Sequence, residues 1–280
     1  MTGRFAYGLR VYGLDDVTDL MPAEPGDDLP EVTIRQHDGP RPTEVPLDRW
    51  RQVRLLADGR HLTVDRRTGT ATFHGPPLTP DLLAHPYLAP PAVVVNRWAG
   101  RETFHAGAFV RHGRAYAVLG PRTAGKSSLL AALAARDVPV LADDVAVVHD
   151  GAVFAGPRCI DLRQPVPGAA LAGRTAREGS RTRVPLPPIA VRAPLAGWFF
   201  LRWGDGPAAT RLAAIDALGR LAAERSWPQL PSDPAVLLGL AALPAWELTR
   251  PRDWTALERT WRLIASVTES ADLATAGRPA

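Results

Sequence analysis

Nine consecutive residues combine glycines, a lysine and hydroxyl side chains at a spacing that suits phosphate binding. They are Gly120, Pro121, Arg122, Thr123, Ala124, Gly125, Lys126, Ser127 and Ser128, and the first eight satisfy the pattern G-x-x-x-x-G-K-[ST]. In such a loop the backbone N–H groups surround the phosphates, the lysine reaches the β- and γ-phosphate oxygens, and the serine hydroxyl ligates Mg²⁺. Chance would produce this match on the order of one time in a thousand. The segment therefore predicts a site for a magnesium nucleoside triphosphate.

The only lysine in the sequence lies in this motif. Lysine and arginine together number 33, and all of them except Lys126 are arginine. An ammonium group is a compact charge on a flexible stem, whereas a guanidinium group is a larger planar fork. The exception indicates that position 126 requires an ammonium group.

Two adjacent carboxylates follow the next apolar segment. Residues 138–142 are predicted to form a buried strand, and Asp143 and Asp144 close it. The carboxyl ends of parallel strands face the ligand crevice of an α/β sheet, so both acids are expected near the phosphates. One can contribute to the Mg²⁺ site and the other can accept a proton from an attacking hydroxyl. The alternative is that they only cap the following turn. The short interval after Lys126 predicts that this strand lies next to the strand before the phosphate loop.

A histidine is the third candidate for chemistry. His105 opens the segment 103–110, which is expected to pair with, or lie beside, the strand that leads into the phosphate loop. Histidine can gain or lose a proton near neutral pH, although a single histidine is more often structural than catalytic. His105 is therefore a candidate for acid–base chemistry, with a structural role as the alternative.

Composition and charge exclude several classes of protein. Of the 280 residues, 46% are hydrophobic and 22% are charged, which indicates a globular chain with room for two domains. Cys159 is the only cysteine, which excludes a disulfide-stapled module. The net charge of +4 is spread over interleaved acids and bases, so no nucleic-acid partner is predicted. No apolar segment suits a bilayer or an export signal, so a cytoplasmic location without membrane contact is predicted.

The first 95 residues are predicted to form a small β-rich domain. Short segments with alternating or β-branched residues are separated by Gly, Asp and Pro turns, at 5–12, 31–36, 52–56, 61–64 and 70–74. Residues 78–98 are predicted to form a helix that prolines interrupt, which would join this domain to the next.

Residues 96–270 are predicted to form an α/β domain around the phosphate loop. Strands are expected at 103–110, 114–119, 138–142, 145–149, 152–155, 195–203 and 246–248, and helices at 127–136, 209–225, 234–243 and 255–267. The stretch 158–188 is rich in Arg, Gly and Pro without periodicity, which is typical of a mobile loop. Residues 271–280 are predicted to be a disordered tail.

The order of these motifs resembles the C-terminal kinase domain of the HPr kinase/phosphorylase family. The resemblance rests on His105-Ala106-Gly107-Ala108, a strand pair, the phosphate loop, a helix, and Leu141-Ala142-Asp143-Asp144. It is specific over 105–148 and extends to 157–162 and 182–187. Together with Tyr7-Gly8-Leu9 and Val32-Thr33-Ile34, it looks like the shorter HPr kinase-like proteins found beside bacterial peptide-modification genes. The fold it implies is an α/β P-loop kinase domain with a small β-rich N-terminal domain.

The resemblance also implies roles for individual residues. ATP and Mg²⁺ would be the cofactors, and the γ-phosphoryl group would pass to a serine hydroxyl on a protein or peptide. Lys126 would contact the phosphates and Ser127 the magnesium. Asp143 would be the base toward the acceptor serine, Asp144 would support it and contribute to the metal site, and His105 would sit beside the reacting phosphate.

The chain departs from the family pattern at three places. Thr123 stands where the family's loop usually has a second glycine. The family's glycine-rich segment and metal-binding glutamate after the acidic pair have no match, Glu178 being a poor substitute, so the resemblance does not extend to phosphorylase activity. The family's C-terminal arginine motif is also unmatched, and Arg181 and Arg183 are the candidates to replace it in stabilising charge.

Two classes of function follow from the sequence. The first is an ATP-dependent serine kinase that acts on a protein or a ribosomal peptide precursor. The second is a nucleotide-dependent binding module or NTPase switch that holds a peptide or partner protein without phosphorylating it, and a small-molecule kinase is a further alternative. The acceptor, the choice between ATP and GTP, and the oligomeric state, a homo-oligomer included, stay open at this level.

Overall fold

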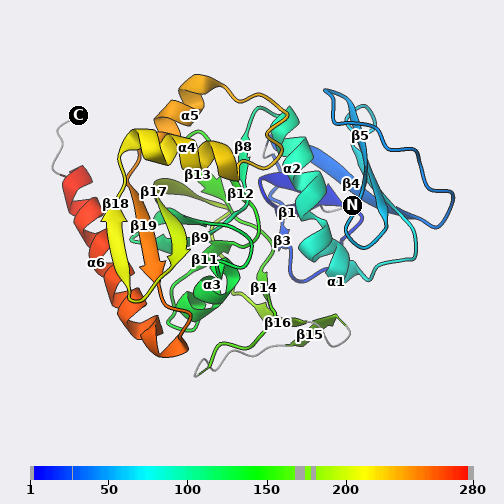
Figure 1. The fold of residues 1–280 in the computed structure, drawn as a ribbon. Helices are drawn as coiled ribbons and strands as arrows, with labels where there is room; N and C mark the ends of the chain where they lie inside the picture. The colour runs from blue at the N-terminus through cyan, green and yellow to red at the C-terminus, as the bar shows by residue number, and fades with distance from the viewer. Residues whose placement is uncertain (1–2, 27, 168–173, 178–180, 277–280) are drawn as a thin grey trace.

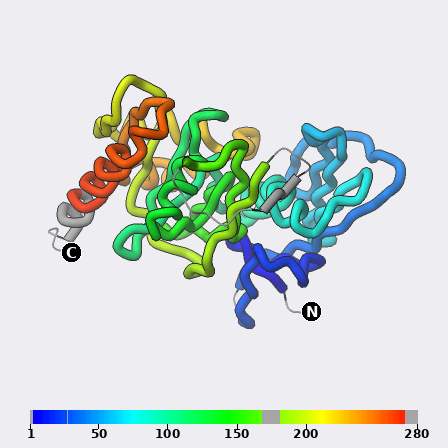
Figure 2. Tube along the Cα trace, turned by 90° about the horizontal axis from the view of Figure 1, so that it is seen from below, coloured from blue at the N-terminus to red at the C-terminus, as the bar shows by residue number. Residues whose placement is uncertain are grey.

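Two large β-sheets lie side by side in the molecule (Figure 1). The computed structural model describes residues 3–26, 28–167, 174–177 and 181–276. In both Figure 1 and Figure 2 the N-terminal sheet occupies one end of the molecule and the C-terminal helix α6 (Leu257–Ala276) the other. None of the described helices is both long and apolar enough to cross a bilayer.

The N-terminal part of the chain folds into a seven-stranded sheet with the order β3-β1-β2-β4-β7-β6-β5. Its alternating sequences bury one face, because Leu62 and Val64 of β6, and Ala71 and Phe73 of β7, point into the core. The predicted strands are present, except that residues 5–12 form two strands joined by a turn. The bounds are β1 Arg4–Ala6, β2 Leu9–Tyr12, β3 Met21–Pro22, β4 Glu31–His37, β5 Arg51–Leu55, β6 His61–Asp65 and β7 Thr70–His74.

A proline-interrupted helical segment connects the two sheets. It consists of α1 (Pro80–Leu82), the π-helical turn η1 (Leu83–Tyr87) and α2 (Ala89–Trp98). The predicted domain boundary at residue 95 falls inside α2. The hydrophobic core is continuous across it, since Phe5 of β1 and Trp198 of the second sheet belong to one cluster of buried side chains. The two sheets therefore share a core.

The second sheet has nine strands with both parallel and antiparallel pairs. Its order is β11-β9-β10-β17-β13-β12-β8, with β19 on β17 and β18 on β19. β10 is parallel to β17 and β17 is parallel to β19, whereas β9 and β10 form an antiparallel pair. The bounds are β8 Glu102–Phe104, β9 Ala106–Arg111, β10 Arg114–Leu119, β11 Val140–Ala142, β12 Ala146–His149, β13 Ala152–Phe154, β17 Arg192–Trp203, β18 Ala208–Arg211 and β19 Ala245–Arg250.

Helices cover both faces of the second sheet, which makes this part of the molecule α/β. Tyr116 and Val118 of β10 share a core with α3 (Lys126–Ala134) and α6. Ala115 and Ala117 of the same strand belong to the other core, with α4 (Ala214–Glu224) and α5 (Pro234–Ala241). Successive residues of a strand point to opposite faces of the sheet, so the apolar residues of β10 contribute side chains to both cores.

The structure corrects four expectations about the second half of the chain. The predicted mobile loop at 158–188 contains a three-stranded sheet, β14-β16-β15, and the prediction was wrong there because cross-strand pairing, not periodicity, orders these segments. The predicted helix at 209–225 begins with β18. The predicted tail, residues 271–280, is helical as far as Ala276, and residues 277–280 lie outside the described part of the chain. β11 does not lie next to β10, because β9 pairs with both. The small-sheet bounds are β14 Cys159–Leu162, β15 Arg174–Arg177 and β16 Arg181–Pro185.

Candidate functional site

The phosphate-loop motif lies between a strand and a helix, the context that its mechanism requires. β10 ends at Leu119, and α3 begins at Lys126. Gly120 and Gly125 have φ values of 146° and 82°, which residues with a side chain rarely adopt. A Cβ on Gly125 would also lie 2.3 Å from Nη2 of Arg250. The two glycines that define the motif are therefore needed for the path of the backbone.

Thr123 has a strained backbone conformation within the loop. Its φ is 74°, in the left-handed region that β-branched residues avoid. This is where the sequence departs from glycine in the family pattern. Its carbonyl accepts a hydrogen bond from Nε1 of Trp203 at 3.3 Å. Strain of this kind persists where the surroundings fix it, and it is common at binding sites.

Arg250, which the sequence did not reveal, holds the phosphate loop through hydrogen bonds to its backbone. Nη2 of Arg250, the last residue of β19, donates to the carbonyls of Ala124 at 3.0 Å and Gly125 at 2.8 Å. Its guanidinium lies 4.4 Å from the ring centroid of Trp203. Burial lowers the pKa of Arg250 to about 10. Nothing in the motif marks this residue, because parallel pairing of β19 with β17 brings it to the loop from far along the chain.

Lys126 lies over the loop with its ammonium group largely buried. Only 7% of the residue is exposed, and Nζ donates to the carbonyl of Gly120 at 2.6 Å. Burial lowers the pKa of Lys126, while the carboxylates of Glu224, Asp143 and Asp144 raise it. The amine is thus held where a phosphate on the helix N-terminus would meet it.

The two adjacent acids lie on a tight turn after β11. The N–H of Val145 donates to the carbonyl of Asp143 at 2.9 Å, and Asp144 between them has a φ of 73°. A two-residue hydrogen bond around such a φ defines a γ-turn of the rare, strained kind. We call residues 143–145 the acidic turn. It separates the two acids, since Asp143 is 4% exposed and the Asp144 side chain 37%.

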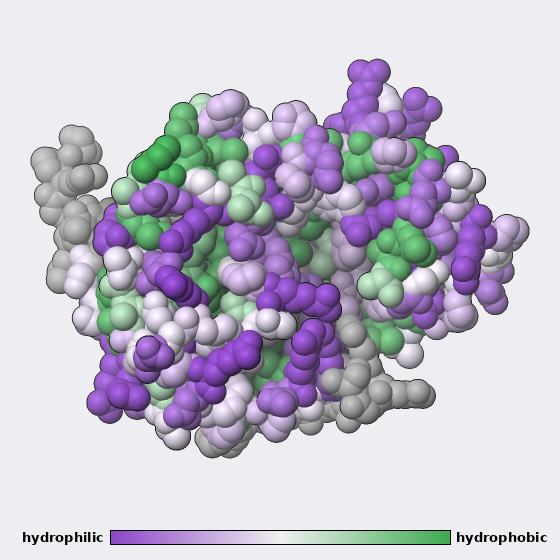
Figure 3. Space-filling view, in the orientation of Figure 1, coloured by the Kyte–Doolittle hydropathy of each residue, from purple (hydrophilic) through white to green (hydrophobic). Residues whose placement is uncertain are grey.

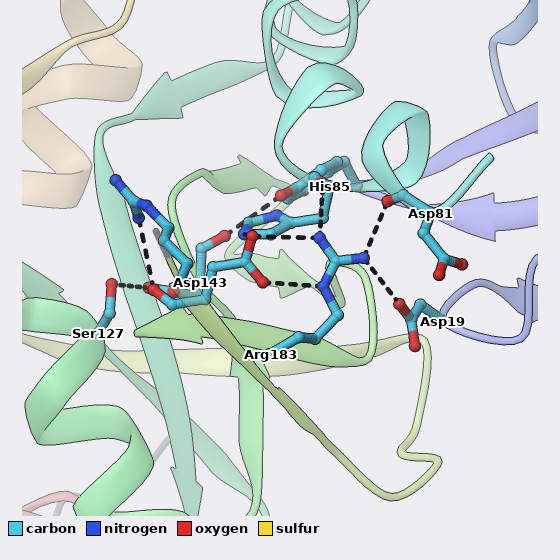
Figure 4. Close-up of polar contacts among 9 residues, drawn as sticks. Asp19, Asp81, His85, Ser127, Asp143 and Arg183 are labelled. Atoms are coloured by element: carbon cyan, nitrogen blue, oxygen red, sulfur yellow. Dashed lines mark hydrogen bonds and ion pairs between the residues drawn. The ribbon is translucent and has the colours of Figure 1, made fainter. Parts of the chain in front are cut away.

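Ser127 and Asp143 are in direct contact, as Figure 4 shows. Oγ of Ser127 donates to Oδ1 of Asp143 at 3.1 Å. Burial, and after it the charge of Asp144, raise the pKa of Asp143 to about 7, although the hydrogen bond from Ser127 opposes the rise. The sequence paired Ser127 with Asp144 at the metal site, whereas the carboxylate that touches Ser127 belongs to Asp143.

His105 accompanies the second acid of the turn. It lies between β8 and β9, and β9 pairs with β10 as the sequence predicted. Its Nδ1 is 3.1 Å from the carbonyl oxygen of Asp144 and 3.6 Å from Oδ1 of the same residue. The side chain is 46% exposed. The imidazole is therefore accessible to solvent and to a ligand beside Asp144.

A cleft of about 1040 Å³ brings the predicted residues together. Lys126, Ser127, Asp143, Asp144 and His105 all line it. Hydrophilic side chains predominate on this face where the two parts of the molecule meet (Figure 3). Gly120, Pro121 and Ala124 of the loop are not among the lining residues, whereas Arg122, Thr123, Gly125 and Ser128 are. The other walls include Arg54, Asp58, His85 and Tyr87 from the N-terminal part, Arg163 and Arg181 from the small sheet and its flank, and Trp227 and Trp254.

Of the arginines predicted to stabilise charge, Arg183 has a different role. It is completely buried and forms ion pairs with Asp161 at 2.8 Å and Asp19 at 3.1 Å (Figure 4). It also donates to the carbonyls of Asp81 and His85. We call Arg183, Asp161 and Asp19 the Arg183 cluster. The prediction was wrong for Arg183, because its donors are directed to protein acceptors that join the small sheet to the N-terminal part.

Arg181 and Glu178 were also named as possible replacements for residues of the family pattern. Arg181 lines the cleft, and its Nη1 lies 3.5 Å from the carbonyl of Asp161. Its role in stabilising charge stays a prediction. Glu178 lies outside the described residues.

The oxygen atoms beside the loop suit magnesium better than a metal held by protein alone. Among the described residues, no group of three or more His, Cys, Asp and Glu side chains could hold a metal ion. Mg²⁺ commonly binds through one or two carboxylates together with substrate phosphates and water. The hydroxyl of Ser127 and the carboxylates of the acidic turn are oxygen donors of the kind Mg²⁺ prefers, so the site fits this cation.

Comparisons with solved structures show a distant similarity. The sequence matches no protein-family model and no curated protein sequence. Among solved structures, the chain is similar to the Hpr(Ser) kinase/phosphatase from Coxiella burnetii. The identity is 14%, and the match covers 61% of this chain and 98% of that chain with a TM-score of 0.31. At that score the similarity adds no argument to the geometry above.

Proposed function

We propose that this protein is an ATP-dependent, HPr kinase-like enzyme that transfers the γ-phosphoryl group to a serine hydroxyl of a protein or peptide. The observation that carries the proposal is the meeting of three groups at one cleft. They are Lys126 at the N-terminus of α3, the contact between Ser127 and Asp143, and the neighbouring pair of Asp144 and His105. Phosphoryl transfer requires mainly positioning and neutralisation of charge, and these groups offer both.

The nucleotide would bind through the loop and the helix it opens. Backbone N–H groups and the positive end of α3 favour the phosphates, and Lys126 adds a full charge. Mg²⁺, when bound, neutralises charge on the phosphate oxygens. The Ser127 hydroxyl would hold it, and Asp144 of the acidic turn would supply a carboxylate oxygen.

Asp143 is the proposed base. A base is most effective when its pKa lies near the working pH, and burial raises the pKa of Asp143 to about 7. It would accept the proton of the serine hydroxyl as that oxygen attacks the γ-phosphorus and the bond to the β–γ bridging oxygen breaks, which releases ADP. Asp144 and His105 would flank the acceptor from the exposed side of the turn.

The size and walls of the cleft support a large acceptor. Pockets for single small ligands are about 300–1,000 Å³. The volume here, about 1040 Å³, lies at the upper limit, and the walls come from the N-terminal part, the small sheet and the second sheet. There is room for a nucleotide together with a segment of peptide, which favours a peptide or protein over a small-molecule acceptor.

The direct test is transfer to serine-containing peptides. The protein is incubated with ATP, Mg²⁺ and a peptide panel, and mass spectrometry measures added phosphate while a second assay measures free phosphate. We expect a phosphorylated peptide, and a loss of about 10²–10⁴-fold in kcat for Asp143→Asn because the base is removed. Asp137→Asn is the matched control, since Asp137 is exposed and precedes the same strand at its other end.

Two outcomes would contradict the proposal. Free phosphate without any phosphorylated peptide would favour the NTPase switch. Transfer that is unchanged in Asp143→Asn would remove the proposed base while leaving the kinase activity itself in place.

A further inference from the structure

A hairpin turn of the N-terminal sheet carries a residue that is unfavourable for its conformation. β1 and β2 pair with Ala6 opposite Leu9, so Tyr7 and Gly8 form a two-residue turn. Both have positive φ values, 56° and 72°. Turns of this kind favour Asn-Gly, and a bulky residue in the first position is a backbone outlier. Something other than local propensity therefore accounts for a tyrosine here.

The turn is buried, and its backbone forms hydrogen bonds with residues outside the N-terminal sheet. The N–H of Tyr7 donates to the carbonyl of Ala155 at 2.7 Å, and Nδ2 of Asn96 donates to the carbonyl of Tyr7 at 2.9 Å. Nη1 of Arg101 donates to the carbonyl of Gly8 at 2.6 Å. These bonds fix the position and direction of the tyrosine, which has no exposed surface.

The tyrosine hydroxyl reaches the acidic turn. It donates to the carbonyl oxygen of Asp143 at 3.2 Å, across 136 positions of the chain. The same oxygen accepts the N–H of Val145 that closes the strained turn. His105 contacts the next carbonyl, that of Asp144. The acidic turn is thus held through the carbonyls of both acids, and one of the two holding side chains comes from the N-terminal sheet.

We infer that Tyr7 is a positioning residue for phosphoryl transfer, whose hydroxyl holds the strained turn that directs Asp143 and Asp144 into the cleft. The inference rests on the proposed kinase function. A left-handed residue such as Asp144 keeps its conformation only when its surroundings determine it. Small misplacement of a reacting group lowers rates strongly, by about 10²-fold for 1 Å. The N-terminal sheet is then part of the catalytic apparatus, although it contributes no group that touches the substrate.

The test is to remove the hydroxyl and keep the ring. Tyr7→Phe still packs against Gly156, where a Cβ would lie 2.9 Å from Cε1 of the ring. Tyr116→Phe is the matched control, because Tyr116 is also buried and its hydroxyl also meets a backbone carbonyl, that of Thr268 at 3.4 Å. Tyr116 lies on the other core, away from the acidic turn.

We expect the two variants to differ in catalysis and not in stability. The urea concentration at the unfolding midpoint should fall by a similar, small amount in both variants. Only Tyr7→Phe should lower kcat, about tenfold, with KM for ATP and peptide within about twofold, because binding groups are untouched. Hydrogen exchange at the Val145 amide should accelerate in Tyr7→Phe alone. Tyr7→4-aminophenylalanine, which restores a donor, should recover most of kcat.

Each other outcome overturns a distinct claim. If Tyr7→Phe and Tyr116→Phe had equal kcat values and the wild type were active, the hydrogen bond of the Tyr7 hydroxyl would only compensate for its burial. The inference would then fail, and the kinase proposal would stand. A Tyr7→Phe variant that folds poorly while the 4-amino variant folds well but stays slow would also overturn the inference. A wild type that phosphorylates no peptide would reject the kinase proposal and the inference with it.

Discussion

The acidic turn with its phosphate loop and the Arg183 cluster both bury charged groups near one cleft, yet they satisfy those groups differently. In the cluster, burial alone would lower the pKa of Arg183, but the hydrogen bond and charge of Asp161, with Cys159 and Asp19, outweigh it and raise the pKa. Every nitrogen of its guanidinium donates to a protein acceptor. The cluster is complete without a ligand.

The site beside the phosphate loop contains buried charged side chains and backbone conformations that are unfavourable without a ligand. Burial lowers the pKa of Lys126 and raises that of Asp143, so each side chain is biased toward its neutral form. Thr123 and Asp144 have left-handed backbones. Perturbed pKa values and strain gather where a ligand completes the interactions. The comparison teaches that burial of charge identifies a functional site only when the charge is left incompletely paired.

The largest expected effect is on stability, at the cluster. Arg183→Ala should lower the free energy of unfolding by about 3–5 kcal/mol, because Asp161 and Asp19 would stay buried without their counter-ion. Urea denaturation measures it. Arg202→Ala is the control, since the Arg202 side chain is 69% exposed and its pair with Glu247 at 3.3 Å lies on the surface. Its loss should be below about 1 kcal/mol. Equal stabilities for the two variants would break the comparison at the cluster.

The next effect is on function, at the loop. Lys126→Ala should weaken phosphoryl transfer by about 10²–10³-fold, because the charge on the phosphates is lost. The free energy of unfolding should stay the same or rise, because a desolvated ammonium group is removed. The peptide-transfer assay measures the loss of activity, calorimetry with magnesium and ATP measures nucleotide affinity, and urea denaturation measures stability. Lys126→Arg should also fail to bind normally, since the loop encloses a compact amine. Unchanged affinity in Lys126→Ala would place the nucleotide elsewhere.

The sequence predicted those parts of the site that are local or follow one strand. The phosphate loop is specified by residues close together in the chain, and its strand and helix show their own apolar patterns. Asp143 and Asp144 were placed near the loop because parallel strands end at one edge. The sequence assigned Asp144 to the side of Ser127, whereas the carboxylate in contact with Ser127 is that of Asp143. The γ-turn that separates the two acids leaves no mark in the sequence.

The parts that the sequence missed depend on contacts between distant segments. Arg250 reaches the loop through the pairing of β19 with β17, and Tyr7 reaches Asp143 through a turn of the other sheet. The small sheet of β14, β15 and β16 was predicted to be a loop because Arg, Gly and Pro hide its alternation. A clue existed at Tyr7-Gly8, where a hairpin turn carries a tyrosine in place of the favoured asparagine.

The last effect concerns the pH dependence of stability, and it tests whether the buried carboxyl of Asp143 is incompletely paired. The pKa of Asp143 rises from 3.8 to about 7 on folding. Between those values the folded chain holds a proton that the unfolded chain has lost, so the contribution to stability is complete below about pH 4 and lost as pH rises through 7. Asp143→Asn keeps the acceptor for Ser127 without the charge. It should therefore be more stable than the wild type at pH 8, by up to about 4 kcal/mol, and equal to it near pH 4.

Urea denaturation between pH 4 and 8, in buffer with a chelator to exclude divalent ions, measures this difference. Asp144→Asn is the graded control, because it removes only the like charge, the second cause of the raised pKa of Asp143. It should therefore show a smaller gain at pH 8 than Asp143→Asn. If Asp143→Asn and the wild type were equally stable at every pH, the carboxyl of Asp143 would be as well satisfied as those of the Arg183 cluster. The distinction between the two regions would then rest on the strained backbone of the turn alone.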